Sequence, residues 1–416
     1  MGAGSAMTET LFESAVVEEP YPYFDSLRKE EPVHRIEGTD TFLVTQLALI
    51  HQVVADTETF SSNSNAFLHV SPDGSPGLRS SMGADPKVEM GGPPVVSVVD
   101  PPDHGRLRKV LNRVLTRAVI DRREAEYREL LDRALDEPLA SGRVEWMGAV
   151  AEPVPSVMLA RILGLDDDLA PFLKEAGFAS VEQIGGFASA DRSRELRDVM
   201  GRLGPVAEAY ERTRQGQSPP SDTVLEACAQ AVEAGEITDA EAIGTLIAVV
   251  TAGTESTSSL LGVGACVLAQ RPDLQDALRR DPSAIPAFVE EACRIDPPFR
   301  GHYRRAIRTA SLAGVEVPAG SHVVLVWPAA NRDPRWFDAP GEFRLDRDAP
   351  RKHLGFGWGI HLCVGAPLAR LQARVTFDRL LERTTSISID PSASPLRHHR
   401  SLMIRRLVEL PLVLRT

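Results

Sequence analysis

Cys363 lies in a glycine-rich segment whose residue types could bind a metal. Residues 356–365 read Phe-Gly-Trp-Gly-Ile-His-Leu-Cys-Val-Gly. Glycines at 357, 359 and 365 permit backbone conformations that residues with side chains resist, and they leave room for a flat ligand against the main chain. A cysteine presented in this way can be a thiolate held by backbone amides, and the thiolate is the form that binds metal. The alternative is a buried structural cysteine beside a turn, because free cysteine commonly behaves as a small hydrophobe.

A second polar group interrupts an otherwise apolar helix. Thr238-Asp-Ala-Glu241 is a capping box and predicts a helix start, and no breaking residue follows until Arg271-Pro272. About 31 residues at 1.5 Å each give a helix of roughly 46 Å. The segment is apolar on almost every side, which indicates that it runs through the core. Its middle reads Thr251-Ala-Gly-Thr-Glu-Ser-Thr257, whose hydroxyl groups can bond back to the preceding turn.

Two interpretations of this polar segment are open. The first is a kinked, buried helix whose hydroxyl groups are satisfied within the helix. The second is a proton-delivery groove, in which Glu255 and Ser256 guide water to a group bound against Ala252 and Gly253.

The elements that position these residues form a mainly α protein with a small β-rich lobe. Helical periodicity dominates from His104 to about residue 295, whereas residues 314–327 predict a hairpin with its turn at 318–320. Residues 61–102 are rich in Gly, Pro and Ser without a sustained period, and a loop of this length is usually functional or disordered. No repeat or linker divides the chain, so we predict one domain over residues 1–416.

The composition is that of a soluble globular protein. The 416 residues are 43% hydrophobic and 25% charged, with a net charge of −12, which argues against binding to nucleic acid through a basic surface. The four cysteines form no CxxC pair, so zinc frameworks and a disulfide scaffold are not expected and a reducing compartment fits. No apolar run near the N-terminus approaches the ~20 residues of a membrane span. We therefore expect a cytoplasmic monomer without a membrane segment, and residues 1–6 to be a leader before a natural start at Met7.

The pattern Phe356-x-x-Gly359-x-His361-x-Cys363-x-Gly365 resembles the haem-binding loop of the cytochrome P-450 superfamily, in its bacterial, soluble form with separate redox proteins. The resemblance implies the cytochrome P-450 fold, with haem b (iron protoporphyrin IX) between the long central helix and the cysteine loop. It also implies that Cys363 is the protein ligand to the iron.

The central polar segment is similar to the family's oxygen-activating stretch, Ala-Gly-x-acid-Thr. In this chain it reads Ala252-Gly253-Thr-Glu255-Ser256, so serine stands where the family usually has threonine. The hydroxyl is kept, but the methyl group that fixes the threonine rotamer is lost. The resemblance implies that Glu255 and Ser256 are catalytic, and that Ala252 and Gly253 contact the haem.

Further resemblances concern cations and supporting residues. The stretch from Asp100 to Arg108 resembles the helix whose His-x-x-x-Arg reaches the haem propionates, and an arginine counted back from Val317-Pro-Ala-Gly320 aligns with another propionate ligand. The implied propionate-binding residues are His104, Arg108, Arg304 (with Arg305 as a one-residue rival) and His361. Glu291-x-x-Arg294 and Arg347 resemble the family's buried ion network and are expected to be structural.

A thiolate ligand favours O–O bond cleavage, so the implied reaction is insertion of one atom of O2 into a small or medium-sized, largely hydrophobic organic substrate. No flavin, NAD or iron–sulfur motif is present, which points to a ferredoxin and an NAD(P)H-dependent ferredoxin reductase as electron source. The basic residues Arg106, Lys109, Arg113 and Arg117 are predicted to form the ferredoxin-docking face on the cysteine side of the haem, although such runs are usually solvated faces.

Other readings of the chain are open. The same haem could perform oxidative coupling, desaturation or rearrangement without oxygen retention, or the chain could be a non-catalytic haem or ligand sensor. Substrate-lining segments are expected at residues 67–90, 172–197, 299–303 and 401–404. Within them Arg300 either faces the pocket and binds an anionic substrate, or points away into a salt bridge or the haem-carboxylate cluster.

Overall fold

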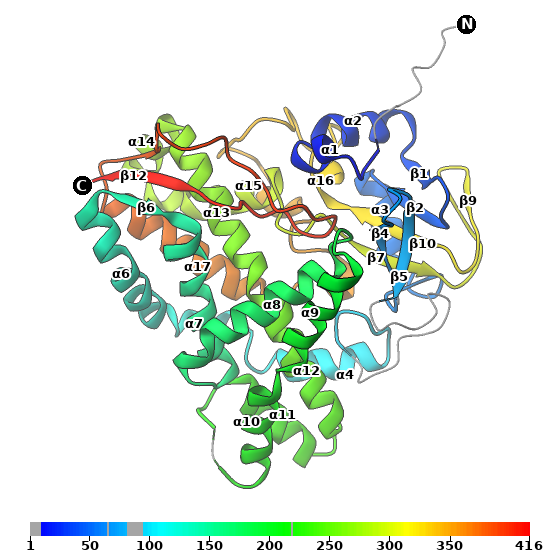
Figure 1. Ribbon diagram of the computed structural model, residues 1–416, viewed down its shortest axis with the longest axis horizontal. Coiled ribbons are helices and arrows are strands. Elements are labelled where there is room, and N and C mark those ends of the chain that lie inside the picture. The colour runs from blue at the N-terminus through cyan, green and yellow to red at the C-terminus, as the bar shows by residue number, and fades with distance from the viewer. Residues whose placement is uncertain (1–9, 65, 81–94, 218) are drawn as a thin grey trace, which may run out of the picture.

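Helices form most of the molecule, and a five-stranded sheet forms a lobe at one side (Figure 1). The computed structural model describes residues 10–64, 66–80, 95–217 and 219–416. The expected leader at residues 1–6 lies outside the described residues. The prediction of a mainly α protein with a small β-rich lobe is confirmed.

The helices pack around two consecutive central helices, α12 and α13 (Figure 1). In chain order they are α1 (Ser14–Glu18), α2 (Tyr21–Glu30), α3 (Leu47–Ala55), α4 (Asp103–Leu111), α5 (Arg117–Asp121), α6 (Glu124–Ser141), α7 (Pro153–Leu163), α8 (Ala170–Ile184), α9 (Ala190–Gly201), α10 (Gly204–Arg214), α11 (Val224–Glu233), α12 (Asp239–Gly253), α13 (Glu255–Gln270), α14 (Pro272–Arg280), α15 (Ile285–Ile295), α16 (Trp327–Ala330) and α17 (Ala366–Glu382).

The central helix begins and ends where the sequence predicts, but it is not continuous. The Thr238 side chain accepts from the Glu241 N–H, and the Glu241 carboxylate accepts from the Thr238 N–H at 2.8 Å, which completes the capping box. The prediction of an unbroken helix is wrong at Thr254, which separates α12 from α13. A Cβ built on Gly177 of α8 would lie 2.0 Å from the Thr254 Oγ1, so α8 presses on the interruption. Thr254 also bonds back to the Val250 carbonyl at 3.4 Å, as expected of a kinked helix.

Most of the central helical segment is buried against other parts of the protein. Among the described residues, one helical segment, Asp239–Gln270, is long and apolar enough to cross a membrane, but 67% of its most apolar window is buried in the protein. Close packing also fixes α13 against α17, the helix that follows the cysteine loop. A Cβ on Gly264 would lie 2.1 Å from the ring of Phe377. The two helices therefore hold the cysteine loop and the central polar segment in a fixed relation.

In the described part of the chain, the strands form one mixed sheet and three smaller ones. They are β1 (Val33–Ile36), β2 (Thr41–Val44), β3 (Phe60–Ser61), β4 (Ala66–Val70), β5 (Pro76–Ser80), β6 (Arg143–Glu145), β7 (Gly301–Ala306), β8 (Ala310–Leu312), β9 (Val315–Val317), β10 (His322–Val326), β11 (Ser386–Ile389) and β12 (Pro411–Arg415). The main sheet has the order β1-β2-β10-β7-β3, with β10 parallel to β2 and antiparallel to β7. The other sheets are β11-β12-β6, β4-β5 and β8-β9.

Two sequence-based expectations about strands need correction. The turn at 318–320 exists, with the Ser321 N–H donating to the Pro318 carbonyl at 3.1 Å, but its two strands do not pair with each other. Strand β9 pairs with β8, and β10 joins the main sheet, because both strands find partners outside the turn. The segment 61–102 also contains the β4–β5 hairpin. Residues 81–94 of that segment lie outside the described residues.

Candidate active site

The cysteine loop is shaped by glycines with positive φ. Gly357 and Gly359 have φ values of 74° and 70°, a region that side chains other than glycine disfavour. A Cβ on Gly359 would lie 2.8 Å from the Val54 Cγ1 of α3, so this position requires glycine for space as well. The Cys363 N–H donates to the Phe356 carbonyl at 2.8 Å and closes the loop. Helix α17 begins three residues after the cysteine.

Cys363 is exposed to solvent, although many protein atoms surround its thiol. The residue is exposed, yet burial by the surrounding protein raises the pKa of the thiol. The N–H groups of Gly365 and Ala366 and the charges of Arg108 and Arg370 act in the opposite direction and favour the thiolate. A metal ion at the sulfur would hold it deprotonated. Cys363 therefore has the donors and cations that a metal-bound thiolate requires.

The residues predicted to bind the haem carboxylates lie together next to this loop. The rings of His104 and His361 are 4.3 Å apart, and the His361 Nε2 bonds to the Ser62 hydroxyl at 2.8 Å. Burial, followed by the charges of Arg304 and of nearby histidines and Arg108, lowers the pKa of His361 to about 3. The buried His104 Nε2 has no hydrogen-bond partner within the described part of the chain. Burial, followed by the charge of Arg108, also lowers the pKa of His104, so both histidines are neutral near pH 7 and can donate only from a ring N–H. The positive charge of this cation cluster comes from Arg108 and Arg304, and an anionic ligand would neutralise it.

The alternation of strand β7 separates Arg304 from its rival Arg305. Arg304 is buried, and its charge acts on His361, whereas Arg305 pairs in register with His322 of β10 and acts on that residue. Successive strand residues point to opposite faces, so Arg304 is the one that lies with His361. His302, two residues before Arg304, shares this face and also acts on His361. Sequence reasoning missed His302, although the period of two on β7 could have found it.

On the central helix the predicted site residues have different surroundings. Ala252 is exposed, but a Cβ on Gly253 would lie 2.8 Å from the Leu159 side chain of α7, so Gly253 is packed against a neighbouring helix. The Ser256 hydroxyl donates to the Ala252 carbonyl at 2.8 Å. The Ser256 hydroxyl and Ala252 therefore lie together on one side of the interrupted helix.

Glu255 lies in a buried ion pair rather than beside the Ser256 hydroxyl. The Arg406 Nε donates to its carboxylate at 2.9 Å, and the same guanidinium donates to Glu152 at 2.8 Å. Burial raises the pKa of Glu255 to about 7, although the charge and hydrogen bond of Arg406 oppose the shift. A carboxyl group with such a pKa can exchange a proton near neutral pH. Arg406 was not predicted, because no local pattern connects it with a residue 151 positions earlier.

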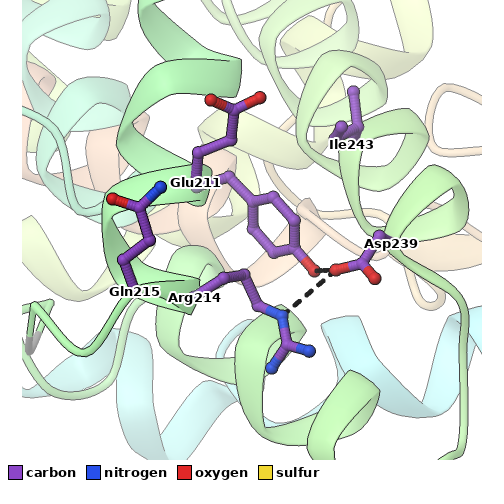
Figure 2. Close-up of a pocket in the computed structure, with 6 residues that line it drawn as sticks. Glu211, Arg214, Gln215, Asp239 and Ile243 are labelled. Atoms are coloured by element: carbon purple, nitrogen blue, oxygen red, sulfur yellow. Dashed lines mark hydrogen bonds and ion pairs between the residues drawn. The ribbon is translucent and has the colours of Figure 1, made fainter.

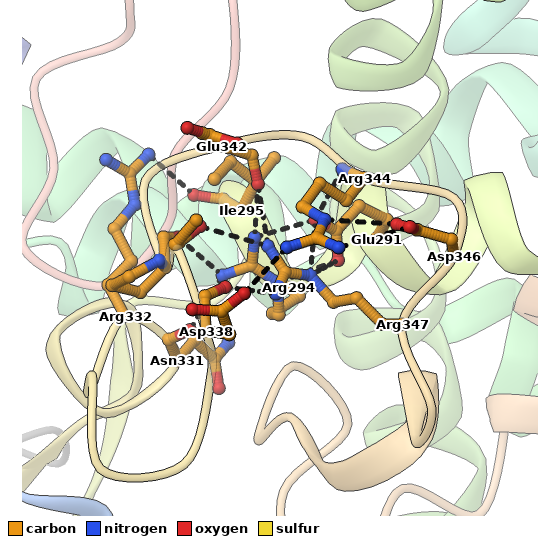
Figure 3. A network of polar contacts seen from close by, with 12 residues as sticks. Glu291, Arg294, Ile295, Asn331, Arg332, Asp338, Glu342, Arg344, Asp346 and Arg347 are labelled. Carbon is orange, nitrogen blue, oxygen red and sulfur yellow. Dashed lines mark hydrogen bonds and ion pairs between the residues drawn. The ribbon is translucent and has the colours of Figure 1, made fainter.

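The buried ion network predicted from Glu291, Arg294 and Arg347 is confirmed (Figure 3). Arg294 is fully buried and donates twice to Glu291 at 2.7 Å, and Arg347 donates to the same carboxylate at 2.8 and 2.9 Å. Further guanidinium N–H groups of both arginines donate to backbone carbonyls of the loop that leads to the cysteine segment. Removal of one partner would leave a buried charge uncompensated.

The neighbouring Glu290 connects α15 to the cysteine loop. Its carboxylate accepts from Arg370 at 2.6 Å and bonds to the His353 Nε2 at 3.0 Å. Burial would raise the pKa of Glu290, but the hydrogen bonds from His353 and Arg370 bring it down to about 2. The Arg370 guanidinium lies 4.2 Å above the ring of Phe356, the first residue of the cysteine pattern. Phe356 is thus clamped by a cation that also acts on Cys363.

The four cations of the predicted docking face, on α4 and the segment that follows it, all take part in ion pairs, and docking of a ferredoxin on this face stays a prediction. Arg106 donates to Glu241 at 2.5 and 2.8 Å, and Arg113 donates to Glu236 at 2.6 Å. Lys109 also lies 3.7 Å from Glu236, and Arg117 is paired with Asp121. Both Glu236 and Glu241 come from the α11–α12 junction, which the spacing on α4 could not reveal. Arg106 and Arg113 thus fasten α4 and the turn after it to the α11–α12 junction, whereas the side chains of Lys109 and Arg117 remain largely exposed.

Arg300 does not face a substrate. It is buried and donates from Nη2 to the Val17 carbonyl at the end of α1, while its Nε and Nη1 have no partner among the described residues. Burial, with a contribution from Arg405, lowers its pKa to about 10. The interpretation that Arg300 points away is correct, but its partner is a carbonyl rather than a salt bridge or the haem-carboxylate cluster. The expectation of an anionic substrate therefore loses its supporting residue.

The four segments expected to line the substrate pocket do converge. The Val70 N–H of β4 donates to the Gly186 carbonyl between α8 and α9 at 2.8 Å, and Arg79 of β5 donates to the Ala188 carbonyl at 3.0 Å. The Leu402 N–H donates to the Gly185 carbonyl at 2.8 Å, and Phe299 forms a β-bridge with Ile404. Residues 81–90 of the first segment lie outside the described residues.

A separate hollow lies between α10 and α12 (Figure 2). Asp239 accepts from the Tyr210 hydroxyl at 2.6 Å and from the Arg214 Nε at 3.1 Å, and Ile243 supplies an apolar wall. None of its lining residues belongs to the cysteine loop or the cation cluster, so we do not include it in the site.

Comparisons with known proteins define the family. A family model described as Cytochrome P450 matches residues 196–406. Cytochrome P450 144 of Mycobacterium tuberculosis is 36% identical over 406 residues, 97% of this chain and 91% of that protein. Cytochrome P450 monooxygenase PikC of Streptomyces venezuelae is 30% identical over 403 residues, 95% of this chain and 91% of that protein. The solved structure of Mycobacterium marinum cytochrome P450 CYP150A6 in its substrate-free form has a TM-score of 0.81 at 29% identity and covers 98% of both chains.

The chain belongs to the cytochrome P450 family. It has the P450 fold, and it is a bacterial haem-thiolate monooxygenase whose electrons derive from NAD(P)H. The residues present fit a haem: the exposed Cys363 lies beside a cluster of cations, and in that cluster the buried His104 Nε2 lacks a hydrogen-bond partner among the described residues. The exposed side chains of Ile360 and Leu362 in the same loop suit contact with an apolar macrocycle.

Proposed function

We propose that this monooxygenase inserts one atom of O2 into a small or medium-sized, largely hydrophobic organic substrate, using electrons from a ferredoxin and its reductase. The observation that carries the proposal is the position of Cys363. The residue is exposed, lies next to the cation cluster, and has a thiol whose ionisation the charge of Arg108 favours. Convergence of the four pocket segments supports a substrate site enclosed by protein rather than an open sensor surface.

We assign the cofactor contacts as follows. The ligand to the iron is Cys363, and its loop is shaped by Phe356 and Gly365. The carboxylates of haem b are held by the cations Arg108 and Arg304 and by ring N–H groups of His104 and His361. Ala252 and the backbone at Gly253 border the cofactor from the central helix. When bound, the thiolate-ligated haem supplies the activation of O2.

Proton delivery is assigned to Glu255 and Ser256. The Glu255 carboxyl, with a pKa of about 7, takes up and releases a proton at Oε2, while its Oε1 accepts from the Arg406 Nε at 2.9 Å and is held in place. The Ser256 Oγ, next in sequence, holds its hydroxyl at the Ala252 carbonyl on the exposed side of the helix. A water that bridges them would carry a proton from the buried acid to the haem side.

The remaining assignments follow the composition and the family. We infer a single catalytic domain over residues 1–416, a cytoplasmic monomer, and no membrane or nucleic-acid partner, consistent with the net charge of −12 and the largely buried central helix. Coupling, desaturation or rearrangement without oxygen retention is the alternative outcome on the same site.

Product mass separates these outcomes. Turnover under 18O2 with a ferredoxin and reductase should give a product two mass units heavier than the product formed under 16O2. A product of unchanged mass, formed with consumption of O2, would favour the oxidase alternative. Spectral shifts on ligand binding without any product would favour a sensor.

A further inference from the structure

A second carboxylate shares the arginine that holds Glu255. The Arg406 Nε donates to the Glu255 Oε1 at 2.9 Å, and the Arg406 Nη1 donates to the Glu152 Oε1 at 2.8 Å. The remaining oxygen of Glu152, Oε2, accepts from the Lys174 Nζ at 3.2 Å. We refer to Lys174, Glu152, Arg406 and Glu255 as the carboxylate cluster. Its two acids come from different helices, because Glu152 directly precedes α7 and Glu255 is the first residue of α13.

The carboxylate cluster runs from the protein surface into the core. The exposed fraction of the side chain falls from 34% for Lys174 and 13% for Glu152 to 8% for Arg406 and 5% for Glu255. Lys174 belongs to α8, and α7 and α8 pack against each other and against α12. The outer end of the cluster therefore meets water where α7 and α8 come together, whereas its inner end is the residue before Ser256.

The backbone before Glu152 has a rare conformation. Residues Met147–Ala151 form a π-helix, in which the Glu152 N–H donates to the Met147 carbonyl at 2.9 Å. Such a turn holds one residue more than an α-helical turn, so it rotates the following side chain by about 100° relative to a continuous α-helix. Short π-turns occur frequently at functional sites. This turn therefore sets the direction of the Glu152 side chain, which points to Arg406.

The two acids of the carboxylate cluster compete for the charge of Arg406. Arginine keeps its proton, so its single positive charge balances one carboxylate and not both. Lys174 supplies a second positive charge only at the surface end, where water and salt screen it. Burial raises the pKa of Glu255, Arg406 opposes this shift, and the negative charge of Glu152 adds to it. A proton on either carboxyl group therefore relieves the repulsion between them.

Two further ionisable groups face the carboxylate cluster. Glu182 of α8 also acts on Glu255, but it is paired with Arg192 at 2.8 Å and 46% of its side chain is exposed. His399 is near Arg406, and burial, followed by the charge of Arg406, lowers its pKa to about 4, so this histidine is neutral near pH 7. Among the described residues around Glu255, Glu152 is thus the acid that is joined to it through a shared arginine.

We propose that Glu152 is the outer acid of the proton route and passes protons from solvent, where α7 and α8 meet, to Glu255. The inference rests on the proposed function, in which Glu255 and Ser256 deliver protons. In each transfer the Glu152 carboxyl group releases a proton to a bridging water, and that water gives a proton to the Glu255 carboxylate. One O–H bond is broken at Glu152 and one is formed at Glu255, Glu152 is then protonated again from solvent, and Arg406 keeps its own protons throughout. Because Glu152 acts through Glu255, it is a positioning residue rather than a catalytic one.

An infrared titration of the ferric holoenzyme tests the coupling between the two acids. The C=O band of the protonated Glu255 carboxyl group is identified by its loss in Glu255→Gln. In Glu152→Gln the midpoint of this band should move to lower pH by about one pH unit, because the neighbouring negative charge is removed. Glu175→Gln, which removes an exposed carboxylate next to Lys174 in the sequence of α8, is the matched control and should leave the midpoint unchanged.

Turnover measurements test the route itself. With saturating amounts of a ferredoxin that reduces the wild type, Glu152→Gln should lower the rate of NAD(P)H consumption under O2 about tenfold and raise its solvent deuterium isotope effect. Glu152→Asp restores an ionisable group and should recover most of the rate, and Glu175→Gln should keep all of it. Oxidation of guaiacol driven by hydrogen peroxide should be equal in all variants, because this oxidant brings its own protons.

The outcomes separate this proposal from the proposed function. An unchanged rate of NAD(P)H consumption in Glu152→Gln would overturn this proposal alone, whether or not the infrared band moves. A lowered rate that Glu152→Asp does not recover, with the band unmoved, would also overturn it, because Glu152 would then act only by holding the structure. A wild type that no ferredoxin reduces, or that lacks the thiolate CO spectrum, would instead overturn the proposed function.

Discussion

Replacement of Glu255 by glutamine should change how the stability of the protein depends on pH. The carboxyl pKa is 4.5 in its reference state and about 7 in the folded protein, because burial outweighs the effect of Arg406. Below pH 4.5 the group is protonated in both states. Between pH 4.5 and about 7 the folded protein keeps a proton that the unfolded chain has lost. The stability contribution therefore falls as pH rises through this window.

The magnitude follows from the two pKa values. Between pH 5 and pH 8 the wild type should lose about 2–3 kcal/mol of unfolding free energy that Glu255→Gln does not lose. The assay is urea unfolding of the holoenzyme at several pH values, followed by circular dichroism. Glu241→Gln is the matched control on the same central helix. Its hydrogen bond from Arg106 lowers the pKa of Glu241 to about 2, so this variant should show a nearly constant offset from pH 5 to pH 8. Parallel profiles for wild type and Glu255→Gln would refute the reasoning, because they would show that Arg406 keeps Glu255 ionised throughout.

Three further predictions concern Ser256, Arg304 and Gly359. Ser256→Ala should still bind haem and substrate but divert reducing equivalents to hydrogen peroxide, whereas Ser256→Thr should keep or improve the coupling of NAD(P)H consumption to product. The measurement is the peroxide formed per NAD(P)H consumed, and unchanged coupling in the alanine variant would contradict the proton relay through Ser256. Arg304→Leu should lower haem affinity about tenfold through loss of a charge-assisted hydrogen bond, whereas Arg305→Leu, on the other face of β7, should have little effect. The rate of haem transfer to apomyoglobin measures both affinities, and equal losses would contradict the assignment of Arg304 rather than Arg305 as the haem-binding arginine. Gly359→Ala should destabilise the protein by about 1–3 kcal/mol, because φ is positive and Val54 leaves no room; an unchanged thermal midpoint would count against this account of the loop.

Features that depend on neighbouring residues in the sequence could be predicted well. The capping box at Thr238 and the Arg271-Pro272 stop gave the ends of the central helix, and the spacing around Cys363 identified the loop. The helix is interrupted at Thr254, where α8 packs so closely that a Cβ on Gly177 would lie 2.0 Å from the Thr254 Oγ1. The hydroxyl-rich segment indicated that a kink could form, but not this contact with α8.

Features that depend on distant partners could not be predicted. Strands β9 and β10 were assigned to one hairpin because they flank a good turn, but each has a better partner elsewhere in the sheets. Glu241 and Glu236, the partners of Arg106 and Arg113, lie 135 and 123 positions further along the chain, so the spacing of the cations could not reveal them. The partner of Glu255 is Arg406, far along the chain, and no periodicity could connect the two.

The most direct test of the account is the spectrum of the reduced protein with carbon monoxide. Purified wild type should bind one haem and show the strongly red-shifted Soret band of thiolate ligation, and Cys363→Ala should lose that band. Cys293→Ala, which removes a buried thiol near the same loop, is the control and should keep it. A Cys363→Ala variant that retains the red-shifted band would contradict the assignment of Cys363 as the iron ligand.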